Sequence, residues 1–227
     1  PDRKGERPEY HLKSFTGILH ADSYAGYNGL YRSEDNPNAT IEEAACWAHS
    51  RRKFYDIIVS NDKANIALAI VEKIAKIYEI ESQIRGLKAE QRLEVRRDKS
   101  KELVDELFVG LNKAYKQLPN KSSTSKAIKY ALNNETALRR LLDNGNIEID
   151  NNAAERALRA VAIGRKNWLF AGSDNGGNTA ATFYTLIETA KLNNINPVKY
   201  LHKVFEVIQD YKANRIEDLL PWNVKLE

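Results

Sequence analysis

The middle of the chain carries a helical pattern of apolar positions. Three apolar stripes recur at spacings of three or four residues, or sums of these, between about Lys63 and Leu142. The first stripe holds Ile66, Ile70, Ile74, Ile77 and Ile84, the second Leu103, Leu107, Leu111, Tyr115 and Leu118, and the third Ile128, Leu132, Leu138 and Leu142. No segment here alternates as a strand does, so the pattern predicts an all-helical module packed mainly on itself.

A strongly charged stretch, Ser82 to Lys101, separates the first two stripes. Its basic residues are Arg85, Lys88, Arg92, Arg96, Arg97, Lys99 and Lys101. Two interpretations stay open: a solvated face of packed helices, or a surface that contacts DNA. The pattern alone favours the solvated face.

The N-terminal flank predicts strands. Gly17 to Asp22 is typical of a short buried strand that ends in a carboxylate. Glu43 to Trp47 predicts a second strand, and His49 to Ile58 continues as a helix rich in positive charge. We therefore expect a mostly helical α/β protein.

The C-terminal flank predicts further helices. Ile147 to Ile149 is a brief extended piece, and Asn151 or Asn152 then caps a helix. Thr179 to Leu192 has the composition of a buried helix, and Pro197 to Tyr211 predicts one more.

Composition narrows the class of protein. Of the 227 residues, 42% are hydrophobic and 29% charged, with no apolar run long enough to span a bilayer. A net charge of +4 permits nucleic-acid binding, and the single cysteine fits a reducing cytoplasm. The chain lacks methionine and begins Pro-Asp-Arg-Lys-Gly, so we expect a fragment, either natural or trimmed.

Two carboxylates are candidates for chemistry. Asp22 ends a strand, where α/β folds place reactive groups, and Glu155 lies one turn into a helix. Each also has a structural interpretation. An Asp at a strand end often caps the next helix, whereas Glu155 could complete a capping box with Asn152 or an ion pair with Arg159.

Longer motifs distinguish these interpretations. The runs Asp150 to Arg159 and Gly164 to Ser173 closely resemble the signature of insertion-sequence-66 transposases. The resemblance continues in four further runs, in the right order along essentially the whole chain: Leu19 to Tyr27, Ala44 to Phe54, Leu186 to Lys191 and Leu219 to Asn223.

The resemblance implies a partial ribonuclease-H-like fold with an Asp, Asp, Glu triad. Asp22 would be the second Asp and Glu155 the Glu, and the first Asp would precede this sequence. It further implies a division into a first part of the catalytic core (1–60), a helical insertion (61–142), the end of the core (143–185) and a C-terminal helical segment (186–227).

The triad implies a cofactor. Strand cleavage and transfer are in-line displacements in which two divalent ions activate the attacking oxygen and stabilise the leaving one. Mg²⁺, or Mn²⁺, would be held by Asp22 and Glu155 together with the first Asp. We therefore expect a complete two-metal site only in the full-length protein, and an inactive chain as written.

The motifs also suggest supporting and DNA-binding residues. Cys46 and His49 form a Cys-x-x-His pattern that lacks the other two ligands of a structural zinc site. The pattern resembles a signature that follows the second Asp in several DDE transposase families, and this resemblance implies that Cys46 and His49 support the catalytic site. We place Asn151 and Asn152 beside the site with them. Candidate phosphate contacts, which could equally be helix-surface charges, are Arg51, Arg52, Lys53, Arg156, Arg159, Arg165 and Lys166. Trp168 could stack on a base or belong to the core.

Two functions follow. The first is the catalytic region of a DNA transposase acting on transposon ends and target DNA, in the bacterial cytoplasm at the nucleoid. A homo-oligomer and helper proteins of the element would be further partners, and no membrane is expected. The alternative is an inactive truncated remnant that binds DNA or an intact transposase.

Overall fold

The computed structural model describes residues 4–34, 36–60, 64–167 and 170–226. Two compact units divide the chain, one ending at Asn152 and the other beginning at Ala153, and each is described by itself. None of the helices in these ranges is long and apolar enough to cross a membrane.

The first unit contains a small parallel sheet. Strand β1, Gly17–Ala21, pairs with β2, Ile41–Ala45, in a register that runs from Gly17 opposite Ile41 to Ala21 opposite Ala45. The predicted second strand, Glu43 to Trp47, is shifted two residues toward the C-terminus. The observed strand is Ile41–Ala45, and Trp47 already starts a helix. A two-stranded sheet confirms a mostly helical α/β fold, whereas the ribonuclease-H-like topology stays a prediction.

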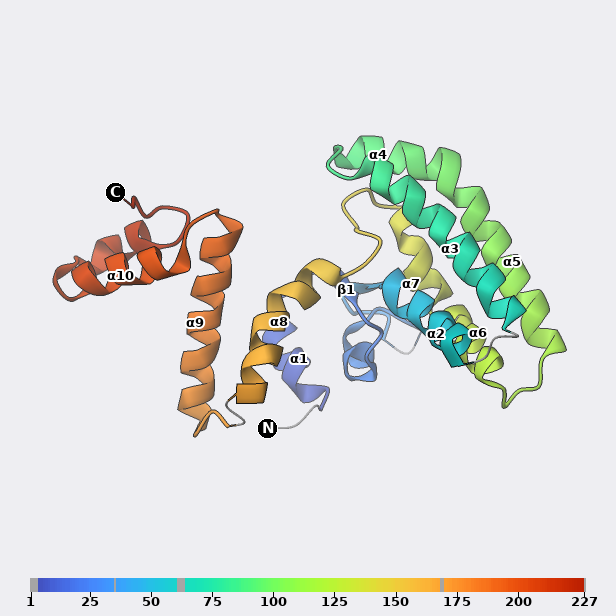
Figure 1. The fold of residues 1–227 in the computed structure, drawn as a ribbon, viewed down its shortest axis with the longest axis horizontal. Helices are drawn as coiled ribbons and strands as arrows, with labels where there is room; N and C mark the ends of the chain where they lie inside the picture. Colours follow the sequence, from blue (N-terminus) through green and yellow to red (C-terminus); the bar gives the residue numbers. More distant parts are fainter. Residues whose placement is uncertain (1–3, 35, 61–63, 168–169, 227) are drawn as a thin grey trace. The chain divides into compact units, whose positions relative to one another are not determined.

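Helices make up the rest of the first unit (Figure 1). Around the strands lie α1 (Glu6–Leu12) and the 3-10 helix η1 (Ala25–Leu30). After β2 come α2 (Trp47–Ser60), α3 (Asn65–Ile84), α4 (Ala89–Val95), the π-helical turn η2 (Arg96–Ser100), α5 (Lys101–Gln117), α6 (Ser123–Asn133), α7 (Glu135–Arg139) and η3 (Arg140–Leu142). Residues 64–142 contain no strand, as the three stripes predicted.

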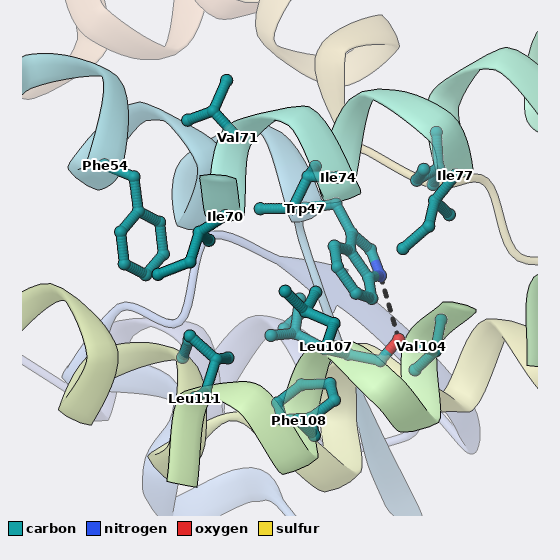
Figure 2. Close-up of a cluster of buried hydrophobic side chains, with 14 of the residues drawn as sticks. Trp47, Phe54, Ile70, Val71, Ile74, Ile77, Val104, Leu107, Phe108 and Leu111 are labelled. Atoms are coloured by element: carbon teal, nitrogen blue, oxygen red, sulfur yellow. Dashed lines mark hydrogen bonds between the residues drawn. The ribbon is translucent and has the colours of Figure 1, made fainter. Parts of the chain in front are cut away.

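One hydrophobic core joins these helices to the sheet. Ile74, Ile77 and Leu111 of the predicted stripes are almost completely buried in it, whereas Ile66 is 40% exposed. Trp47 enters the same core from α2, and its indole N–H donates to the Leu138 carbonyl at 3.0 Å (Figure 2). Because α2 and β2 share this core, the expectation that the helical region packs mainly on itself holds only in part.

The second unit has a small core of its own. Its helices are α8 (Asn152–Asn167), whose first residue closes the first unit, α9 (Asp174–Leu192), α10 (Pro197–Val207), and the 3-10 helices η4 (Ile208–Asp210) and η5 (Ala213–Leu219). Ala190, Tyr200, Val204 and Leu219 form the core. Among the described residues of α9 only Ala190 is buried, so the prediction of a buried helix was wrong. The buried residue that α9 contributes to this core, Ala190, lies near the C-terminal end of the helix.

Candidate functional site

Three segments that are distant in sequence meet where β1 and β2 end. The Cys46 N–H donates to the Ala21 carbonyl at 3.1 Å, and the Trp47 N–H donates to the Ile149 carbonyl at 3.1 Å. The carboxyl ends of parallel strands are where α/β proteins place their sites. Asp22, the start of α2 and the segment that leads into α8 therefore lie at one junction.

The side chain of Asp22 is exposed at this junction. It directly follows β1, and its carbonyl accepts a hydrogen bond from the Tyr130 hydroxyl at 3.2 Å. The next residue, Ser23, has a φ of 59°, a conformation that non-glycine residues rarely adopt and that is concentrated at functional sites. Local structure thus holds the Asp22 backbone while its side chain remains accessible.

A cleft of about 520 Å³ opens beside Asp22. It is lined by Lys4, Arg7, Pro8, His11, Leu12, Asp22, Tyr24 and Tyr27, which come from α1, η1 and their flanks. A carboxylate next to two basic side chains and aromatic rings can receive a phosphate group together with a cation. The sequence did not indicate Lys4 and Arg7, because α1 lies outside the runs that resemble the transposase signature.

Cys46 and His49 lie at the start of α2. The Cys46 side chain is buried, and burial raises the pKa of its thiol, with the Asn151 backbone opposing this in part. Over the ranges that the structure describes, no three His, Cys, Asp or Glu side chains gather as a metal would require. Cys46 is thus part of the packing at the junction, and the supporting role of Cys46 and His49 in catalysis stays a prediction.

Asp150 starts α8. Its Oδ1 accepts the Asn152 N–H at 3.1 Å, and its Oδ2 accepts the Tyr78 hydroxyl at 3.2 Å. The expected cap was Asn151 or Asn152. The Asn151 side-chain oxygen has no hydrogen-bond partner among the described residues, and Asp150 accepts the first N–H of the helix. Burial, followed by the charge of Asp150, raises the pKa of Tyr78, so its hydroxyl stays protonated and donates.

The charged stretch between the first two stripes contains two buried arginines. Arg92 is 8% exposed and Arg96 0%, so for these two residues both the solvated-face and the DNA-contact interpretations were wrong. Arg96 forms a bidentate ion pair with Glu81, with both bonds at 2.7 Å. The available signal was Glu81 itself, which occupies the apolar stripe between Ile77 and Ile84.

Glu155 lies in the first turn of α8 and is half-buried. Because Asp22 belongs to the first unit and Glu155 to the second, each is described in its own surroundings. Their approach to a common metal site stays a prediction.

The candidate DNA-binding residues are exposed wherever they are described. On α2 these are Arg51, Arg52 and Lys53, and on α8 Arg156, Arg159, Arg165 and Lys166. The Lys53 ammonium lies 4.2 Å from the centre of the Tyr130 ring, which connects α2 to the residue that holds the Asp22 backbone. Trp168 lies outside the described residues.

Comparisons with known proteins agree with the motifs. Two family models match, the Transposase IS66 family over residues 1–179 and the IS66 C-terminal element over residues 185–222. Two uncharacterized proteins of Sinorhizobium fredii (strain NBRC 101917 / NGR234) are similar: y4qI is 42% identical over 95% of this chain and 40% of its own length, and y4hP is 40% identical over 99% of this chain and 42% of its own. The uncharacterized protein YuaK of Escherichia coli (strain K12) is 49% identical over 22% of this chain and 52% of its own length.

No solved structure matches the chain. The chain spans about two fifths of the length of the Sinorhizobium relatives. The first family model covers well over half of the sequence, and the second covers most of what remains. The chain therefore belongs to the IS66 family of transposases.

Proposed function

We propose that this chain is part of the catalytic region of a DNA transposase, with Asp22 and Glu155 as two of its metal-binding acids. The observation that carries the proposal is the exposed Asp22 at the carboxyl end of a parallel strand, hydrogen-bonded through its backbone to α6. The same junction holds Ile149, six residues before Glu155. Chain connectivity thus allows the second acid to lie near the first.

The donor set suits a hard cation. Carboxylate oxygens are the ligands that Mg²⁺ and Mn²⁺ prefer, and Asp22 presents one from an accessible position. A pair of such ions would stabilise the attacking and leaving oxygens of an in-line displacement at phosphorus. Asp22 and Glu155 would hold them with a third acid, which we expect from a part of the protein that precedes this sequence.

The chain's own basic groups would bind the substrate. Lys4 and Arg7 share the cleft with Asp22, and Arg51, Arg52 and Lys53 are exposed on the helix that begins at the junction. Contacts of this kind neutralise phosphates without reading sequence. They would hold the DNA backbone against Asp22 and leave the choice of target to other groups.

The test is a cleavage assay on element-end DNA with Mg²⁺ or Mn²⁺. It compares this chain with a version extended upstream to include the first acid. We expect cleavage from the extended protein alone, and a loss of about a hundredfold or more for Asp22→Asn or Glu155→Gln in that protein. Asp174→Asn, which removes an exposed acid from the start of α9, is the matched control and should cleave normally.

Two results would contradict the assignment. If the short chain cleaves as well as the long one, the acids are misassigned and the missing acid lies inside this sequence. If the extended protein binds DNA without cleaving it, the alternative of a binding module is favoured.

A further inference from the structure

The segment between η3 and α8 has a fixed path without regular structure. Residues 143–151 form no helix or strand, yet the side chains of Ile147 and Ile149 are buried in the main core. Backbone groups in such a segment still need hydrogen-bond partners once they are buried. The structure supplies such partners from the side chains of Arg92 in α4 and Arg96 in η2, and from the backbone N–H of Trp47 in α2.

Arg96 is the centre of this arrangement. Its guanidinium donates to the carbonyls of Leu141 at 3.1 Å, Asn144 at 3.3 Å and Ile147 at 2.8 Å. The two remaining donors bind the Glu81 carboxylate. All five N–H donors of the guanidinium are thus used, two of them on the irregular segment and one on η3, which precedes it.

Arg92 adds a second contact to the same segment. It donates to the Ile147 carbonyl at 3.0 Å and to the Glu148 carboxylate at 2.7 Å. Gly145 packs directly on the start of α4, where a Cβ atom would lie 1.8 Å from the Ala89 carbonyl oxygen. The segment is therefore pressed against α4 as well as hydrogen-bonded to it.

The contacts continue to the first residue of α8. Tyr78 of α3 donates to the Asp150 carboxylate, whose other oxygen accepts the Asn152 N–H. The Trp47 N–H holds the Ile149 carbonyl from α2. An unbroken series of hydrogen bonds therefore runs from the helical region to the point where the Glu155 helix begins.

We propose that Tyr78, Arg92 and Arg96, here called the brace, position Glu155 for catalysis by fixing residues 147–152. This inference rests on the proposed function, in which Glu155 is a catalytic acid. Glu155 follows Asn152 by three residues, about 4.5 Å of helix rise, so a displaced helix start displaces the carboxylate. Metal-assisted reactions tolerate little displacement, because misplacement by about 1 Å can cost a hundredfold in rate.

A role in stability alone explains the brace less well. Buried ion pairs contribute little compared with well-packed apolar residues of similar volume. One brace residue, Arg96, also lies in a π-helical turn, a feature frequent at functional sites. Besides the ion pair with Glu81, donors of all three brace residues bind the irregular segment that leads to Glu155.

Hydrogen exchange of single amides tests the positioning directly in this chain. Tyr78→Phe keeps the ring and removes only the hydroxyl that holds Asp150, so it should fold normally. We expect it to speed exchange of the Asn152 amide by about tenfold, the equivalent of removing one hydrogen bond to a charged group. Arg96→Lys removes a hydrogen bond to the Ile147 carbonyl. The Trp47 amide donates to Ile149, two residues further along the same segment, so its exchange should become faster as well.

Arg139→Lys is the matched control. Arg139 also pairs with two acids, Glu135 and Asp105, but in the part of the chain that the structure describes it has no hydrogen bond to residues 141–151. It should leave both amides unchanged. Exchange that is unchanged in the brace variants, or that rises equally across the core of α3 and α5, would overturn the proposal.

The second readout is the kinetics of the full-length protein. The brace variants should lower kcat for strand cleavage by about tenfold or more while KM for DNA stays within about twofold. Faster amide exchange with unchanged kcat would overturn the positioning role. Absence of cleavage by the unmodified full-length protein would instead contradict the proposed function, and the exchange result would stand.

Discussion

Cys46 is a buried residue of the junction. Its side chain is 1% exposed, and burial raises the pKa of the thiol above its ordinary value. Because the thiolate is the reactive form, we expect no reaction of the folded chain with a disulfide reagent at neutral pH. Unfolding in urea should release one reactive thiol per chain, the only cysteine present. Rapid modification of the folded chain would contradict the buried position.

Glu43 of β2 gives a pH-dependent prediction. Burial raises the pKa of its carboxyl group, and Arg140 opposes the shift. A carboxyl with a raised pKa in the folded state favours folding when protonated, and that contribution is lost as the pH rises through the raised pKa. Glu43→Gln should therefore raise the melting temperature at pH 7, and the difference should vanish below about pH 4.

Its neighbour Glu42 supplies the control for this experiment. Glu42 pairs with Arg140 and is 37% exposed, so Glu42→Gln should lower stability slightly, by about 0–1 kcal/mol. A lower melting temperature for Glu43→Gln at pH 7 would contradict a raised pKa of the half-buried Glu43 carboxyl group.

Single residues differ in how well the sequence revealed them. Asp22 could be found because a strand pattern ends at it and a longer motif surrounds it. Arg96 could not, because nothing in a run of basic residues shows which one turns inward to a buried Glu81. That choice is made by hydrogen bonds to residues 141–147, which are distant in sequence.

At the scale of elements, Gly145 fixes how the irregular segment meets α4. Gly145→Ala would place a Cβ atom 1.8 Å from a backbone oxygen, which no side-chain rotation relieves. We expect a loss of about 1–3 kcal/mol in the free energy of unfolding, measured in urea. Gly110→Ala is the control: it is exposed on α5 with nothing within 4 Å, and should stabilise by about 0.5–1 kcal/mol.

Elements with strong periodicity could be predicted and short ones could not. The stripe through Ile70, Ile74 and Ile77 predicted α3 because a helix of 20 residues repeats its pattern several times. The five-residue β2 offered too few positions to define its ends. The three residues Ile147 to Ile149 were likewise too few to show whether they form a strand. Ile147 and Ile149 are buried, but within the ranges described they pair with no strand.

At the scale of the whole molecule, the separate cores of the two units predict independent unfolding. The larger core contains Trp47 and the α3 stripe, whereas the smaller one is built around Tyr200. Calorimetry should therefore show two transitions, and a piece that ends at Asn152 should keep the transition of the larger unit. A single transition that includes Trp47 and Tyr200 would show that the units unfold together.

The fold of the whole could be inferred only through the resemblance. Periodicity predicted helices and two strands, but it carries no information on which strands of a longer protein would extend the small sheet. The site has the same limit. The motifs name Asp22 and Glu155 as candidates, but a run of basic residues does not show that two of its arginines, Arg92 and Arg96, bind the carbonyl of Ile147.

DNA binding provides the last prediction. Binding through phosphates releases counterions, so affinity should fall steeply with salt, and each phosphate that the protein no longer neutralises should reduce the slope of log K against log salt by about 0.9. Lys53 is exposed on α2 and lies on the ring of Tyr130, whose hydroxyl holds the Asp22 backbone. We therefore expect Lys53→Ala to weaken binding of duplex DNA and to reduce that slope by about 0.9, measured by fluorescence anisotropy.

Lys113→Ala is the control, because it removes the same charge from an exposed position on α5. It distinguishes DNA binding at the junction from attraction of DNA by the net charge of the chain. If DNA binds at the junction, the slope for this variant should match that of the unmodified chain, because the junction is formed by the ends of β1 and β2, the start of α2 and Ile149, and not by α5. Equal reductions in the two variants would mean that net charge alone attracts the DNA. The positive charge near Asp22 would then have no part in placing DNA at the candidate acids.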